Sequence, residues 1–147
     1  SQSIEPYDSN YYIKDTAKGK IPIKNPFLEK ILINNNKNTE EVWQDILEKG
    51  GSVQHLKFLT DEEKEVFKTF AELSQLELAQ NVSIIQKYID QGQSINIMVH
   101  PATPAKDLNQ LYLTAEELGL KSIYYQYSMS AAQVFNRNLL NCSSCEG

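Results

Sequence analysis

The sequence predicts an α/β fold made mostly of helices, with one βαβ unit near its end. Three consecutive patterns predict the unit: apolar and polar residues alternate over residues 94–99, an amphipathic helix runs from Thr103 to Gly119, and residues 121–127 form a second apolar run. Strands joined by a helical crossover pair in parallel. Because two strands alone bury little surface, we expect further strands of the same sheet to lie elsewhere.

Shorter patterns predict the elements at the start of the chain. Two apolar runs, at residues 11–14 and 21–23, predict a hairpin or a pair of edge segments. Asn25 and Pro26 then fit the N-cap and the first residue of a helix that continues to about Ile33.

Three further helices are predicted by their caps and apolar faces. One begins after Thr39 and ends at the glycine pair 50–51. The next begins at Thr60, which can form a capping box with Glu63. Helical pattern resumes over residues 76–88, either as a bent continuation or as a separate helix. The face expected for the helix at Thr60 comprises Val66, Phe67, Phe70 and Leu73, and that for the helix at Thr103 comprises Leu108, Leu111, Tyr112 and Leu118.

Composition and charge exclude several classes of function. The net charge of −5 is unlike that of proteins that bind a phosphate backbone, which carry a basic face. No stretch approaches the roughly 20 apolar residues that span a bilayer, and the polar N-terminal residues fit neither a signal nor a transit peptide. We therefore expect no nucleic-acid partner, no membrane partner and a cytoplasmic location, in which cysteines stay reduced.

The chain holds two cysteines, Cys142 and Cys145, in a C-x-x-C pair. Thiols at this spacing can cycle between dithiol and disulfide by thiolate exchange. Residues 128–147 contain few apolar anchors, so we expect a flexible tail that carries the pair as a mobile redox carrier. Two other interpretations stay open: cysteines without a role, and a metal site, for which His55 and His100 are poorly spaced and more simply structural.

Tyr124 and Tyr125 are adjacent within the apolar run of residues 121–127. On a regular strand, consecutive side chains point to opposite faces, so the simplest interpretation is an aromatic pair that packs on both faces of the sheet. The alternative is a relay for oxidising equivalents formed by two adjacent phenols. The two residues by themselves leave both interpretations open.

In collinear order, segments along essentially all 147 residues resemble the C-terminal part of the large, catalytic (alpha) subunit of class I ribonucleotide reductase. The matching segments are Ile4-Glu5-Pro6, Ser9-Asn10, Gly51-Ser52-Val53-Gln54-His55, Phe67-Lys68-Thr69, Gln91-Gly92-Gln93-Ser94-Ile95-Asn96, Gly119-Leu120-Lys121-Ser122-Ile123-Tyr124-Tyr125 and the terminal cysteine pair. The resemblance implies that residues 1–127 form the C-terminal segment of a ten-stranded α/β barrel, which explains the incomplete sheet, and that residues 128–147 are its redox tail.

The resemblance also implies roles for four residues. Tyr125 matches the radical-path tyrosine nearer the small-subunit interface, and Tyr124 matches the one that oxidises the active-site cysteine. Cys142 and Cys145 match the pair that re-reduces the active-site disulfide and is itself reduced by thioredoxin or glutaredoxin. No cofactor and no metal is expected in this chain; a metal-radical cofactor is expected in the small radical-generating subunit.

Other groups of the family's chemistry have no counterpart in this sequence: the cysteine that becomes a thiyl radical, the two that reduce the ribose, the glutamate base and the nucleotide-sensing region. We therefore expect the chain to convert ribonucleoside diphosphates to deoxyribonucleotides only together with the remaining N-terminal part of the large subunit and with the small subunit. A split gene, an excised intein and a cut fragment stay open as origins of the break. The sequence leaves nucleotide preference, the metal and the stoichiometry undetermined.

Two functions from other classes were weighed against this one. The first is a non-catalytic helical interaction module with a redox-labile tail. The second is an independent thiol oxidoreductase, which is disfavoured because too few residues follow Cys145 to form the helix that activates such a thiol.

Overall fold

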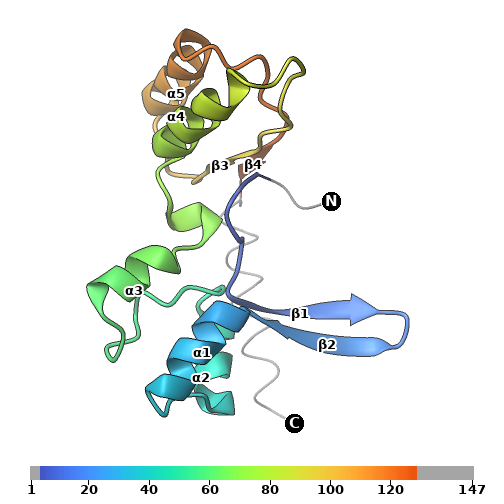
Figure 1. The fold of residues 1–147 in the computed structure, drawn as a ribbon, viewed down its shortest axis with the longest axis vertical. Helices are drawn as coiled ribbons and strands as arrows, with labels where there is room; N and C mark the ends of the chain where they lie inside the picture. The colour runs from blue at the N-terminus through green and yellow to red at the C-terminus, as the bar shows by residue number, and fades with distance from the viewer. Residues whose placement is uncertain (1–3, 129–147) are drawn as a thin grey trace. The chain divides into compact units, whose positions relative to one another are not determined.

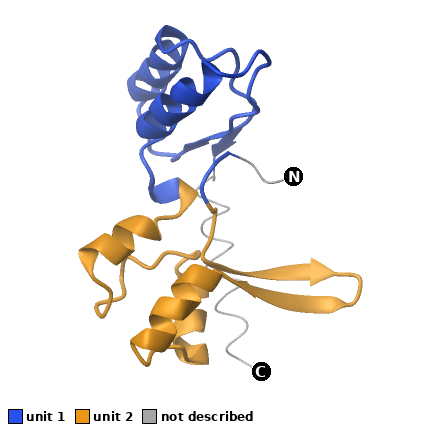
Figure 2. Ribbon diagram, in the orientation of Figure 1, with its two compact units in different colours: residues 1–6, 71–147 blue, residues 7–70 orange. Residues whose placement is uncertain are grey.

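The computed structural model describes residues 4–128, which fall into two compact units, shown in different colours in Figure 2. One unit comprises residues 7–70, and the other comprises residues 4–6 together with residues 71–128. Cys142 and Cys145, and the tail predicted to carry them, lie outside the described residues apart from residue 128.

The unit of residues 7–70 begins with the predicted hairpin (Figure 1). Strands β1 (Tyr11–Thr16) and β2 (Gly19–Lys24) pair antiparallel, with Tyr11 opposite Lys24. The turn between them places Gly19 at a φ of 122°, in the left-handed region that a side chain disfavours. Of the two predicted arrangements, the hairpin is therefore the correct one.

Three helices follow the hairpin: α1 (Pro26–Asn34), α2 (Glu40–Glu48) and α3 (Asp61–Val66). The predicted caps at Asn25 and Thr60 are present, because the side-chain oxygen of each accepts a hydrogen bond from a first-turn backbone N–H. Thr39, where the second helix was expected to open, is its N-cap in the same way. Thr60 and Glu63 complete the capping box, since the Glu63 carboxylate accepts from the Thr60 N–H at 2.8 Å. These helix starts were predictable because capping is a local interaction.

The face predicted for α3 is wrong in its extent. The helix ends at Val66, whose side chain is 76% exposed, while Phe67 and Phe70 lie beyond the helix and are buried, Phe67 in the core of this unit. The Phe67 carbonyl oxygen, which a continuing helix would use, accepts a hydrogen bond from the buried Asn10 side chain at 2.7 Å. A 3-10 turn, η1 (Phe70–Glu72), comes next, so the pattern over residues 76–88 belongs to a separate helix.

Side chains from α1, α2 and the loop after α2 form the core of this unit. Its fully buried side chains are Leu28, Leu32, Trp43, Ile46 and Val53. Asn10 ties the loop and the helices together: its amide nitrogen donates to the Gly51 carbonyl at 3.0 Å as well as to Phe67, and its oxygen accepts from Asn25 at 2.8 Å. A buried amide is costly unless satisfied in this way.

The second unit contains the predicted βαβ unit. Helix α4 (Gln75–Gln86) precedes β3 (Ile97–Val99), and helix α5 (Ala105–Glu117) connects it to β4 (Gln126–Ser128), which pairs with β3 in parallel. Figure 1 shows α4 and α5 side by side on one side of the two strands. Within residues 4–128 the strands form two separate pairs and no closed barrel.

Two expectations for this unit are corrected. The ladder is shorter than the apolar runs, because residues 94–96 and 121–125 make hydrogen bonds that do not continue it. The predicted inward face of α5 is only partly covered. Ala115 is buried, but Tyr112 is 39% exposed, and the three leucines predicted to face inward, Leu108, Leu111 and Leu118, are half-buried. Among residues 4–128, part of the apolar stripe of α5 therefore has no covering neighbour.

Candidate functional site: a stacked tyrosine pair

Tyr124 and Tyr125 lie immediately before β4, and their rings pack against each other. The ring centroids are 4.0 Å apart and the planes are tilted by 55°. Both side chains are open to solvent, with exposed fractions of 60% and 53%. The prediction that they point to opposite faces of a regular strand is therefore wrong.

The backbone explains the contact between the rings. The Tyr124 N–H donates to the Ile95 carbonyl at 2.6 Å, and the Tyr125 N–H donates to the Asn96 side chain at 3.2 Å. On a regular strand only every second N–H faces a given neighbour. Two consecutive N–H groups that face the same neighbour mark a bulge, and a bulge re-aims the side chains it carries.

Two further tyrosines, which the sequence did not indicate as site residues, contact this part of the chain. The ring of Tyr127 is centred 6.3 Å from that of Tyr125, and the Tyr112 hydroxyl donates to the Gln126 side chain at 2.9 Å. Spacing could have found Tyr127, because residues i and i+2 of a strand share a face. No spacing pattern indicates Tyr112, because its contact with Gln126 depends on how α5 lies beside β4.

The two phenols of the pair are linked electrostatically. The pKa of Tyr124 is raised above its ordinary value, chiefly because a side-chain hydrogen bond with Tyr125 favours the protonated phenol. Partial burial and the nearby Tyr127 phenol act in the same direction, to a smaller extent. A phenol that stays protonated and hydrogen-bonded to its neighbour suits coupled movement of a proton and an electron.

Side-chain contacts also fix the chain that leads into the pair. The Lys121 ammonium donates to the carbonyls of Ile89 and Asp90, and the Ser122 hydroxyl donates to the Gln93 carbonyl at 3.3 Å. These bonds hold residues 121–125 against residues 89–96 over a stretch where the regular ladder is absent. The tyrosines thus project from an anchored segment.

The two histidines have local partners, as expected of structural residues. The ring of His55 bonds the Asp45 carboxylate at 2.7 Å, and the exposed His100 accepts from the Ala102 N–H at 3.1 Å. Within residues 4–128 no cluster of three or more His, Cys, Asp or Glu side chains could hold a metal ion. No helix in that part of the chain has the length and apolar character needed to cross a membrane.

The chain was compared with known proteins. The family described as ribonucleotide reductase, barrel domain, matches residues 1–126. The chain belongs to the ribonucleotide reductase family. It is 42% identical over 136 residues to the ribonucleoside-diphosphate reductase large subunit of Invertebrate iridescent virus 6, covering 90% of this chain and 14% of the viral protein. It is 35% identical over 162 residues to the corresponding subunit of Invertebrate iridescent virus 3, covering 100% of this chain and 25% of that protein.

Among solved structures, the class Id ribonucleotide reductase alpha subunit of Actinobacillus ureae superposes with a TM-score of 0.80 at 67% identity. That match covers 92% of this chain and 24% of the alpha subunit. The chain is thus part of a ribonucleotide reductase large subunit, as its motifs predicted, and spans a quarter or less of these three relatives. The α/β fold is confirmed at the level of the barrel-domain family.

Proposed function

We propose that this chain supplies the last two steps of a radical-transfer path to a ribonucleotide reductase active site, through Tyr125 and then Tyr124. The observation that carries the proposal is the direct contact of the two rings, 4.0 Å between centroids, on an anchored segment of a family member. Transfer between redox groups depends steeply on their separation and orientation, and contact removes the need for an intermediate carrier.

The step is balanced as a transfer of one electron and one proton. The neutral Tyr125 radical accepts both from the Tyr124 phenol, which leaves Tyr125 as a closed-shell phenol and Tyr124 as the neutral radical. The proton would pass between the two phenols along the interaction that raises the Tyr124 pKa. The Tyr124 radical then takes a hydrogen atom from a cysteine thiol in the remaining part of the large subunit, which starts reduction of a ribonucleoside diphosphate.

Cys142 and Cys145 are proposed to return electrons after each turnover. They would exchange with the active-site disulfide as a dithiol and be re-reduced by thioredoxin or glutaredoxin. Replacing both with serine would leave the first turnover intact and stop thioredoxin-driven cycling. Continued multiple turnover by the Cys142→Ser/Cys145→Ser enzyme would contradict this role.

The chain spans a quarter or less of the three relatives compared with it, so we expect partners that supply the rest of the enzyme. We propose assembly with the rest of the large subunit and with a small subunit whose metal-radical cofactor provides the oxidant. Exposed apolar residues at the end of α4 support a covering partner, because monomeric proteins rarely leave such clusters in water. The exposed residues there are Ile84, Ile85, Tyr88 and Ile89.

The test is steady-state reduction of a ribonucleoside diphosphate by the assembled reductase carrying Tyr124→Phe or Tyr125→Phe. Each variant keeps the ring and loses the phenol, so we expect turnover to fall to background while assembly is retained. Tyr12→Phe is the control, since this 45% exposed tyrosine lies on β1, belongs neither to the pair nor to the apolar cluster at the end of α4, and should keep full activity. Full activity of either variant in the pair would refute the relay.

A further inference from the structure

The geometry of the tyrosine pair depends on a break in strand register. The regular part of the ladder sets Ile97 opposite Gln126, with the Ile97 N–H donating to the Tyr125 carbonyl at 2.9 Å. Continued upstream, a parallel ladder would bring the Tyr125 N–H to the Ile95 carbonyl. That carbonyl instead accepts from Tyr124, one residue earlier. The register break leaves the Tyr125 N–H in need of another acceptor.

The side chain of Asn96 provides this acceptor. Its amide oxygen lies 3.2 Å from the Tyr125 nitrogen, in the place that a backbone carbonyl would take in a regular ladder. Because this side-chain oxygen accepts in place of a backbone carbonyl, two consecutive residues, Tyr124 and Tyr125, direct their N–H groups toward the same neighbouring segment. Their rings consequently lie on one side and touch.

Asn96 is itself held through its backbone. Its backbone N–H donates a short hydrogen bond to the carboxylate of Glu5, a residue 91 positions earlier in the sequence. Glu5 and Asn96 are both half-buried, so water competes only partly for these bonds. Hydrogen bonds to a charged acceptor are among the stronger ones, and this one fixes the backbone from which the Asn96 side chain extends.

We propose that Asn96 is a positioning residue for radical transfer: its side-chain oxygen, anchored through Glu5, maintains the bulge that stacks Tyr124 on Tyr125. The inference rests on the proposed function for its consequence, but the geometric claim stands independently of it. Misplacement of reacting groups by about 1 Å can cost about a hundredfold in rate. We therefore expect loss of the Asn96 acceptor to lower turnover by about tenfold to a hundredfold.

Three variants of the assembled reductase test the proposal. Asn96→Leu keeps the approximate shape of the side chain and removes the acceptor. Asn96→Asp keeps an acceptor oxygen and should recover much of the lost turnover. Gln75→Leu is the matched control, because the Gln75 side chain likewise accepts a backbone hydrogen bond, from the Met98 N–H of β3 at 2.8 Å, two residues after Asn96.

Each variant is measured in two ways: the crystallographic distance between the two ring centroids, and the turnover number. We expect the rings to part and turnover to fall in Asn96→Leu, with both close to wild type in Asn96→Asp and Gln75→Leu. A merely structural role for Asn96 would predict no difference between Asn96→Leu and Gln75→Leu. If Asn96→Leu does not fold, Asn96→Ala is measured in the same two ways.

The two readouts separate this inference from the proposed function. If the rings of Asn96→Leu stay 4.0 Å apart, the positioning role is overturned whatever the activity. If the rings part and turnover falls, the role is supported. If the rings part and turnover is unchanged, Asn96 does hold the bulge, and it is the radical relay through the pair that fails.

Discussion

Each unit of the molecule contains an aromatic pair with tilted rings, and the two pairs differ in burial and in the partners of their polar groups. In the unit of residues 7–70, Tyr11 and Trp43 lie 5.4 Å apart between ring centroids, and both are buried. In the other unit, Tyr124 and Tyr125 are closer, at 4.0 Å, yet more than half exposed. Burial of rings stabilises a fold, whereas exposed rings contribute little to it. The second pair therefore calls for an explanation outside folding.

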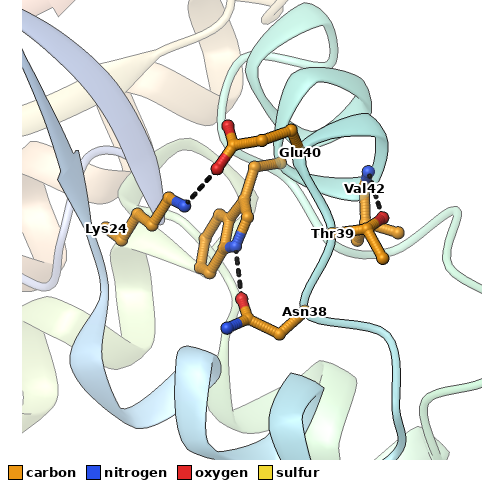
Figure 3. Close-up of polar contacts among 6 residues, drawn as sticks. Lys24, Asn38, Thr39, Glu40 and Val42 are labelled. Atoms are coloured by element: carbon orange, nitrogen blue, oxygen red, sulfur yellow. Dashed lines mark hydrogen bonds and ion pairs between the residues drawn. The ribbon is translucent and has the colours of Figure 1, made fainter.

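The polar groups of the two pairs are also bound differently. Beside the buried pair, the Trp43 ring nitrogen donates to the side chain of Asn38 at 2.7 Å; Figure 3 shows Asn38 together with the Lys24–Glu40 ion pair. The Lys24 ammonium lies 5.0 Å from the Trp43 ring and bonds Glu40 at 3.0 Å. In the exposed pair, the Tyr125 side chain instead raises the pKa of Tyr124. The Trp43 ring nitrogen thus bonds a side chain outside its pair, whereas the phenol of Tyr124 is perturbed by the other ring of its own pair.

The largest effect is expected from breaking the buried pair. Trp43→Ala removes a side chain with no exposed surface and should lower the free energy of unfolding by about 3–5 kcal/mol. Denaturant unfolding of the full chain measures this loss. Tyr125→Ala is the matched change in the exposed pair and should alter stability by less than about 1 kcal/mol. Equal losses would remove the distinction between the two pairs.

A smaller effect is expected from the partner of the Trp43 ring nitrogen. Asn38→Ala removes the acceptor at an exposed position, where water can replace it, so the cost should be about 1 kcal/mol. The same unfolding measurement applies. A loss as large as that of Trp43→Ala would mean that this hydrogen bond, rather than ring burial, dominates the contribution of the tryptophan.

The smallest effect concerns ionisation within the exposed pair. Because the Tyr124 pKa is raised, the protonated phenol adds stability at pH values below the ordinary tyrosine range, and this is lost as the pH rises through the raised value. Phenolate absorbance of wild type minus that of Tyr124→Phe isolates this titration. When both proteins also carry Tyr125→Phe, the same difference in absorbance should titrate with an ordinary tyrosine pKa.

An unchanged difference curve in that background would show that Tyr125 does not cause the shift. Tyr88→Phe serves as the control background, because Tyr88 is not among the groups that perturb Tyr124. In that background the raised titration should persist.

The sequence predicted the features that arise from neighbouring residues. The caps at Asn25 and Thr60 and the parallel pairing of β3 with β4 follow from patterns in the sequence, and the structure confirms them. The end of α3 was missed because Asn10, 57 positions before Phe67, takes the carbonyl that the helix would have used. Local periodicity carries no information about such a contact.

The same reason explains the site. Adjacent phenols could be seen in the sequence, but their contact depends on Asn96, 29 positions before Tyr125, and on Glu5, 91 positions before Asn96. An alternating pattern predicts a regular strand, and a side chain that replaces a backbone carbonyl overrides it. The radical-path and shuttle roles of the tyrosines and cysteines remain predictions from the resemblance.

The most direct test of the central claim is to look for the radical on the exposed pair. In the assembled reductase, Tyr125 is replaced with an aminophenol analogue of tyrosine, which oxidises more easily and so traps a radical that reaches this position. Electron paramagnetic resonance is recorded after substrate is added. The account predicts an aminophenoxyl signal that appears with loss of the small-subunit radical. Loss of that radical, or continued turnover, without any such signal would contradict transfer through Tyr125.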